Sequence, residues 1–145
     1  MKTKSVHVLL LLGTAISLFS CRKQINESYN TRLLTERSWS YDKFGIDENL
    51  DGDIDIPTNF ETCTLDDIVT FNAGGSGSFN QGSDLCYPDF PQSQPFDWQF
   101  HNNEKQIEYG GTVHTILALN ETELSIYTEE STGSSTVRHI LSYKH

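Results

Sequence analysis

Short segments of alternating apolar and polar residues fill most of the chain after residue 64, and they constrain its fold more than any other feature. Turn-forming pairs such as Gly110-Gly111 separate them at roughly the 8–12-residue spacing of all-β domains. Such alternation is typical of strands with one buried face, and no sustained helical period follows residue 38. The segments are residues 65–71, 78–80, 96–100, 106–109, 112–119, 123–128 and 136–143, preceded by residues 38–44. About eight strands in this order predict an all-β antiparallel meander, closed as a barrel or packed as a sandwich.

The first 20 residues predict a signal peptide rather than part of the fold. Lys2 and Lys4 precede an apolar run over residues 6–19 that is too short to span a bilayer comfortably. The sequence Leu18-Phe19-Ser20-Cys21 resembles a bacterial lipobox, and this resemblance implies cleavage before Cys21 and acyl chains, palmitate among them, on that residue. Arg22, rather than Asp, follows the cysteine, which by analogy with lipoprotein sorting favours the outer membrane of the cell envelope. The alternative is an ordinary signal peptide with a chance cysteine.

Removal of residues 1–20 would leave 125 residues, the size of one domain, with a net charge of about −12. That charge disfavours binding to nucleic acid and to anionic membrane surfaces beyond the anchor. We expect residues 21–31 to be the lipidated cysteine and a polar tether, residues 32–37 a short helical turn, and residues 32–145 one monomeric domain.

Two cysteines remain once Cys21 is lipidated. Cys63 and Cys86 belong to no Cys-x-x-Cys motif and have no histidine near them in sequence. In an oxidising compartment such a pair favours a disulfide, which would stabilise the fold by roughly 3 kcal/mol. A metal site is the alternative.

An acidic stretch in the expected long loop of residues 46–63 has the spacing of a calcium loop. The acidic and amide residues that would supply oxygen ligands are Asp47, Asn49, Asp51, Asp53 and Asp55. Calcium takes six to eight oxygen ligands on a flexible backbone, and Gly52 supplies the turn. Position 12 of an EF-hand would be Thr58 rather than Glu, so the loop is not an EF-hand. The alternative is a solvated acidic turn without a cation.

In order along the chain, these features resemble the lipocalin-like domains of small bacterial lipoproteins. The matching residues are Leu33-Leu34-Thr35 before Trp39, Asp47-x-Asn49-x-Asp51-Gly52, Cys63-x-x-Asp66-Asp67-x-x-x-Phe71, a glycine-rich turn, Cys86, the Trp98 segment and Leu124-Ser125-Ile126. The resemblance implies an eight-stranded up-and-down barrel with Trp39 in its closed end. It also implies an arginine from the last strand over the Trp39 ring, and Arg138 is the candidate.

An aromatic stripe and few titratable groups mark the predicted interior. The stripe and its neighbours are expected to fill the interior or to line a pocket for one small apolar ligand: Trp39, Phe71, Phe79, Phe96, Trp98 and Phe100, with Arg138 near the end of the barrel. His139 is expected in the core or at the ligand. Asp67 is expected on the Val69 face, capping the strand start, while Asp66 faces water.

Two functions are consistent with these patterns. The first is a non-enzymatic envelope lipoprotein that holds a small apolar ligand. The second is an interaction module whose two long loops, residues 46–63 and 82–95, contact a protein or glycan, with calcium ordering the first loop. No nucleophile–base pair can be nominated from the sequence, so an enzyme is not expected.

Overall fold

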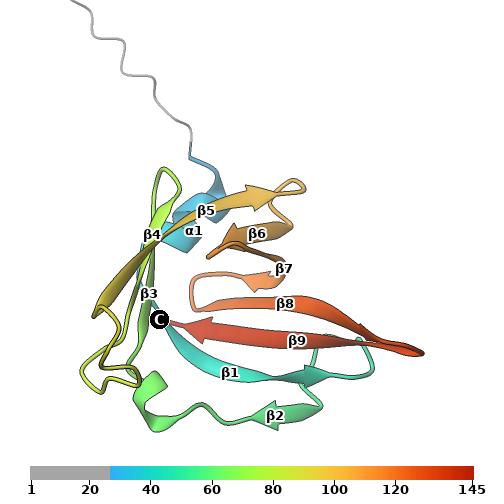
Figure 1. Cartoon of the computed structure of the whole chain (residues 1–145). Coiled ribbons are helices and arrows are strands. Elements are labelled where there is room, and N and C mark those ends of the chain that lie inside the picture. Colours follow the sequence, from blue (N-terminus) through green and yellow to red (C-terminus); the bar gives the residue numbers. More distant parts are fainter. Residues whose placement is uncertain (1–26) are drawn as a thin grey trace, which may run out of the picture.

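The computed structural model describes residues 27–145 and contains, in that range, one α-helix, one 3-10 turn and nine strands (Figure 1). The predicted signal peptide and the lipidation site Cys21 lie outside the described residues. The elements are α1 (Tyr29–Thr35), β1 (Trp39–Asp47), β2 (Ile56–Thr58), η1 (Thr62–Thr64), β3 (Ile68–Asn72), β4 (Ser76–Asn80), β5 (Ser93–His101), β6 (Gln106–Tyr109), β7 (Thr112–Leu119), β8 (Glu123–Thr132) and β9 (Ser135–Lys144).

All nine strands of the described chain belong to one antiparallel sheet. From β3 to β9 each strand pairs with the next, and β1 pairs with both β3 and β9, so the sheet closes into a ring (Figure 1). The β6–β7 hairpin turns at Gly110 and Gly111, whose φ angles of 58° and 81° lie where glycine is favoured. The prediction of an all-β antiparallel fold is therefore confirmed, and β2 is an additional strand that pairs only with β1.

The two stretches predicted as long loops are shorter than expected. In the first, β1 continues to Asp47 and β2 forms around Pro57, which pairs with Gly45. Proline is tolerated there because β2 has no partner on its other side. In the second, β5 begins at Ser93 and includes Pro95, at an end where β5 pairs with β4 alone. The two prolines were therefore misleading as loop signals.

Helix α1 closes one end of the ring. It begins at Tyr29, earlier than predicted, because the Ser28 hydroxyl accepts a hydrogen bond from the backbone N–H of Thr31 at 3.0 Å. Its buried Leu34 accepts a hydrogen bond through its carbonyl from the Trp39 indole at 2.9 Å. The helix contacts both β3 and β7, and the Trp39 ring is fully buried beneath it.

The expectation that Arg138 covers the Trp39 ring is wrong. His145 takes that place, with its ring centroid 3.8 Å from that of Trp39. Arg138 lies 4.5 Å over the ring of Tyr127 instead. The register explains the difference, because Arg138 pairs with Asp47 at the far end of β1, about 26 Å from Trp39 at the usual rise per strand residue.

The core lies between the helix and the middle of the ring. Phe71 is 1% exposed and makes edge-to-face contacts with Phe96, Trp98 and Tyr109, at centroid distances of 5.4–5.8 Å. A Cβ atom at Gly77 would overlap the aromatic ring of Phe96, so the absence of a side chain at Gly77 allows Phe96 to pack there. The predicted stripe thus separates: Trp39, Phe71 and Trp98 are buried core, whereas Phe96 and Phe100 are partly buried at its edge.

Candidate functional site

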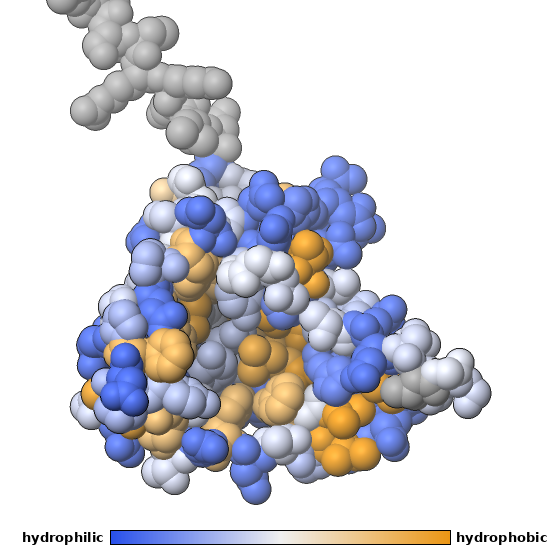
Figure 2. Space-filling view, viewed as in Figure 1, coloured by the Kyte–Doolittle hydropathy of each residue, from blue (hydrophilic) through white to orange (hydrophobic). Residues whose placement is uncertain are grey.

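The ring contains a cavity of about 340 Å³ that opens to solvent and is lined by no residue of α1. Figure 2 shows apolar side chains gathered in the middle of the face that looks into the ring. Six strands contribute to the lining, which consists of Tyr41, Val69, Phe79, Gln94, Pro95, Phe96, Tyr109, Gly110, Leu141 and Tyr143. This volume falls within the usual range for small-molecule pockets, as does a mostly apolar lining with a few polar groups.

Another hollow, of about 950 Å³, lies between α1 and the β3–β4 turn. None of the titratable residues that line it is buried, and its walls include the glycine turn at Gly74 and Gly75. Of these two hollows, only the cavity inside the ring has buried polar groups that converge on it. It is therefore the better candidate site.

Three tyrosine hydroxyls meet at the inner cavity wall. The hydroxyls of Tyr109 and Tyr143 are hydrogen-bonded at 2.7 Å, and the rings of Tyr41 and Tyr143 lie 5.1 Å apart. Burial raises the pKa of Tyr41 to about 12, with further contributions from Tyr109 and the negative charge of Asp67. Burial also raises the pKa of Tyr109 and of Tyr143. All three therefore stay neutral near pH 7 and keep a proton to donate.

His114 on β7 completes this part of the interior. Its ring stacks on Tyr109 at a centroid distance of 5.0 Å, and burial lowers its pKa. His139, expected in the core or at the ligand, lies instead beside Glu130 at 2.8 Å with about a third of its side chain exposed. That expectation is wrong, because β9 carries His139 toward the open β8–β9 tip.

Asp67 is the buried acidic group beside these tyrosines. It precedes β3 on the face of Val69 and Phe71 and is only 5% exposed. Within the described chain its Oδ1 has no hydrogen-bond partner. Burial, and then the neighbouring charge of Asp66, raise its pKa to about 6. It faces inward as predicted, but it forms no capping bond through that oxygen.

The adjacent Asp66 has a different role. Its Oδ2 accepts hydrogen bonds from the backbone N–H and the hydroxyl of Ser83, at 2.6 and 2.8 Å, and from the backbone N–H of Asp84 at 3.1 Å. The backbone bond from Ser83 is the largest cause that lowers the pKa of Asp66. Asp66 therefore fixes the β4–β5 connection, whereas Asp67 has no comparable structural bonds.

The connection from residue 81 to residue 92 is built against the cavity mouth. Gln81 is 2% exposed; it accepts the N–H of Tyr87 at 3.1 Å and donates to the carbonyls of Tyr87 and Pro91, both at 3.2 Å. A second pocket of about 270 Å³ shares Phe79 and Gln94 with the cavity and is also lined by Gln81, Tyr87 and Phe90. Tyr87 and Phe90 are 62% and 58% exposed, so two aromatic rings stand in solvent beside the mouth.

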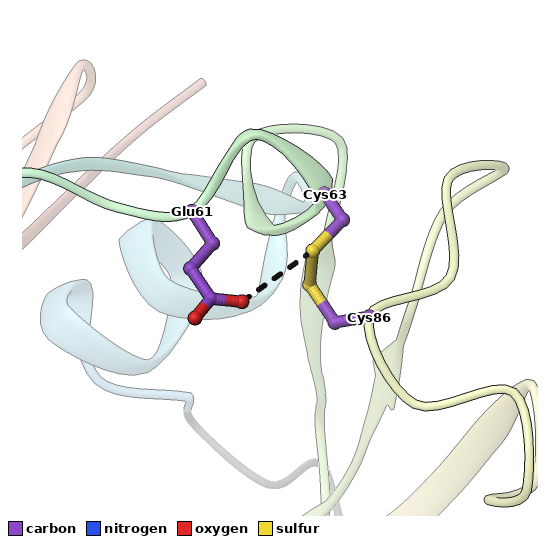
Figure 3. Close-up of side chains that lie close together, drawn as sticks. All are labelled: Glu61, Cys63 and Cys86. Carbon is purple, nitrogen blue, oxygen red and sulfur yellow. Dashed lines mark hydrogen bonds between the residues drawn. A yellow bond between two sulfur atoms is a disulfide. The ribbon is translucent and has the colours of Figure 1, made fainter.

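The predicted disulfide between Cys63 and Cys86 is confirmed (Figure 3). It joins η1 to the connection that Gln81 and Asp66 hold. Glu61 Oε2 lies 3.8 Å from the Cys63 sulfur, and these three side chains are close enough together to suggest a metal cluster. Both sulfurs are bonded to each other and carry no proton or thiolate, so the metal alternative does not fit this arrangement.

The acidic loop after β1 is closed by its own hydrogen bonds. Fully buried Asp47 accepts the N–H groups of Leu50 and Gly52, at 2.6 and 3.0 Å. Asp55 accepts the N–H of Glu48 at 2.8 Å. Arg138 lies 3.8 Å from Asp47 and donates to the Leu50 carbonyl at 2.9 Å.

Asn49, Asp51 and Asp53 continue the same pattern of local bonds. The Asn49 side chain accepts the Asp51 N–H, and the Asp51 side chain accepts the Asp53 N–H, each at 2.9 Å. Within residues 27–145, no three carboxylates of this loop come within 4.8 Å of one another. Calcium binding here stays a prediction from the sequence.

Comparison with protein-family models, with curated proteins and with solved structures gives no match for this chain. Among the described residues, no helix has the length and apolar character needed to cross a membrane. The functional residues that the sequence reasoning missed are the three tyrosines and Gln81. Strand alternation offered a signal for the tyrosines, because Tyr41 shares a face with Trp39, Tyr109 with Ile107, and Tyr143 with Leu141.

Proposed function

We propose that this chain is a lipid-anchored lipoprotein of the bacterial cell envelope whose lipocalin-like ring holds one small, mostly apolar ligand. The tyrosine-lined cavity carries the proposal. It lies inside a closed sheet, its lining is largely aromatic and aliphatic, and three neutral hydroxyls converge on it. The anchor rests on the lipobox resemblance at Cys21, and no enzymatic role is proposed.

The size of the cavity supports a small ligand, because about 340 Å³ lies in the range of small-molecule sites and the cavity is open to solvent, so a ligand can enter it. Phe79 and Phe96 are only partly buried against the core, and both line the cavity. An apolar body would replace water there, and the hydroxyls of Tyr109 and Tyr143 would orient its polar group.

A native mass spectrum tests this proposal directly. The protein would be the mature chain from residue 21 with Cys21→Ser, exported behind a signal sequence that is not lipidated and purified without detergent. We expect an adduct of a few hundred daltons that is lost on denaturation. A chain of bare polypeptide mass that also fails to bind the neutral fluorescent probe N-phenyl-1-naphthylamine would contradict it.

Paired variants locate the binding. Leu141→Trp places a larger side chain in the cavity and should abolish probe binding, whereas Leu117→Trp, on a residue 38% exposed, should leave it unchanged. Equal loss in both variants would place the probe somewhere other than the cavity.

A second function is favoured by the exposed rings of Tyr87 and Phe90. Their centroids lie 5.9 Å apart on a connection fixed by Gln81 and the disulfide, so the rings are held in solvent without apolar cover. Rigid exposed aromatics are frequent contact residues for proteins and sugars. Tyr87→Ala with Phe90→Ala should remove retention on a glycan or protein array while leaving N-phenyl-1-naphthylamine binding intact. Retention that survives both substitutions would contradict this function.

A further inference from the structure

Asp67 is a carboxyl group without a counter-ion in an apolar interior. None of the ion pairs formed within residues 27–145 includes it, and its Oδ1 has no hydrogen-bond partner there. A buried carboxylate oxygen without a hydrogen-bond partner is unfavourable, and such atoms in native proteins require an explanation. The Oδ1 of the neighbouring Asp66 also lacks a partner, but its Oδ2 accepts three hydrogen bonds from Ser83 and Asp84, and in the described chain none is found for the Asp67 carboxylate.

The surroundings of Asp67 suit a positive charge. The register that pairs Trp39 with Val69 and Ser40 with Ile68 brings Asp67 opposite Tyr41, and both Tyr41 and Val69 line the cavity. The Tyr41 ring lies 5.1 Å from the rings of both Phe60 and Tyr143, which gives an aromatic wall beside the acid. Aromatic faces attract ammonium groups, and a carboxylate adds a charge-assisted hydrogen bond.

A negative or neutral ligand would leave this carboxylate unsatisfied. An anion would meet the charge of Asp67 at close range in a medium of low dielectric constant, and the chain as a whole has a net charge of −10. A neutral ligand could donate a hydrogen bond to the carboxylate or use the tyrosine hydroxyls but would not neutralise the charge. A cation would gain from both.

We propose that the cavity takes a small organic cation, a primary ammonium group on an apolar and preferably aromatic body. The ammonium group would lie between Asp67 and Tyr41, and the body would lie against Phe79 and Phe96. This assignment rests on the proposed function of the cavity as a small-ligand site and names the chemical class of the ligand.

The test compares three probes that share one aromatic body. 2-Phenylethylamine is a cation at pH 7.5, 2-phenylethanol is its neutral counterpart, and 3-phenylpropionate is an anion. Their dissociation constants would be measured by isothermal titration on the mature chain with Cys21→Ser. We expect the amine to bind at least about tenfold more tightly than the alcohol, as a hydrogen bond to a charged group implies, and the anion to bind least.

In Asp67→Asn the dissociation constants of the amine and the alcohol should agree to within about twofold, because the substitution removes the charge and keeps the shape of the side chain. Asp97→Asn removes an equal charge from an exposed position on β5 and should preserve the preference. An amine that binds no better than the alcohol, or a preference that survives in Asp67→Asn, would overturn the assignment. If N-phenyl-1-naphthylamine still binds in that case, the proposed function stands; if no probe binds, both are refuted.

Discussion

Asp67→Asn should make the protein more stable at neutral pH, although it alters a buried residue. Folding raises the pKa of Asp67 from 3.8 to about 6, chiefly because burial disfavours the charged form. The folded state therefore holds this proton more tightly than the unfolded state does. Below about pH 3, under the unfolded-state pKa of 3.8, both states are largely protonated, and the favourable contribution of the protonated acid is fully present. It is lost as the pH rises through about 6.

The size of the effect follows from that pKa change. Each tenfold change in an acid constant corresponds to about 1.4 kcal/mol, so ionisation of Asp67 lowers the free energy of unfolding by about 3 kcal/mol above pH 7. Asparagine has nearly the same shape and no charge. The Asp67→Asn variant should therefore gain about 2–3 kcal/mol at pH 7.5 but only about 0.5 kcal/mol at pH 4.

Urea unfolding followed by tryptophan fluorescence measures this difference. With a typical urea dependence for a domain of this size, the midpoint should rise by about 1–2 M at pH 7.5 and hardly change at pH 4. Other titratable groups with shifted pKa values, such as His114 and Glu108, are common to both proteins and cancel in the difference. Asp97→Asn is the control and should show no pH-dependent gain. Loss of stability at pH 7.5, or an equal change at both pH values, would refute the reasoning.

The remaining predictions concern the loops and the tyrosine pair. Reduction of the Cys63–Cys86 disulfide, which joins residues 23 apart, should lower the free energy of unfolding by about 3 kcal/mol in urea; an unchanged midpoint would contradict this. Gln81→Ala removes three hydrogen bonds and should cost about 2–3 kcal/mol and speed hydrogen exchange in residues 82–92, and unaltered exchange would count against it. Tyr143→Phe should cost about 1 kcal/mol in the same urea assay, and no loss would argue against the Tyr109 bond. Millimolar calcium should raise the melting temperature above its value in chelator, because a tenfold excess over the dissociation constant adds about 1.4 kcal/mol to the free energy of unfolding. Asp51→Asn should remove this rise. Equal melting temperatures in calcium and in chelator would exclude the site.

Local rules predicted much of this fold, and the failures have physical causes. Alternation located the strands of the ring, and Gly110-Gly111 located a hairpin, because each signal depends on neighbouring residues alone. Pro57 was misleading because its acceptability depends on which edge of β2 is paired, a property of the whole sheet. The position of Arg138 relative to Trp39 depended on the register between β1 and β9, which alternation does not define.

The candidate site was less predictable than the fold. Alternation placed Asp67 on the same face as Val69, but whether a carboxylate has a partner depends on residues from several other strands. The meeting of Tyr41, Tyr109 and Tyr143 likewise requires β1, β6 and β9 to lie around one interior. Because the ring is closed by segments that are distant in sequence, no local pattern can predict which side chains meet in its interior.

The two readings of Asp67 predict opposite signs for one substitution. A carboxylate that serves the fold has partners, as Asp66 has, and its removal lowers stability. A carboxylate kept for a ligand is unsatisfied in the empty protein, so its removal raises stability and lowers affinity. Asp67→Asn measured for both properties therefore separates the two roles. A variant that is more stable and has lost its preference for the amine would mean that the chain retains Asp67 for binding, at the expense of its own stability.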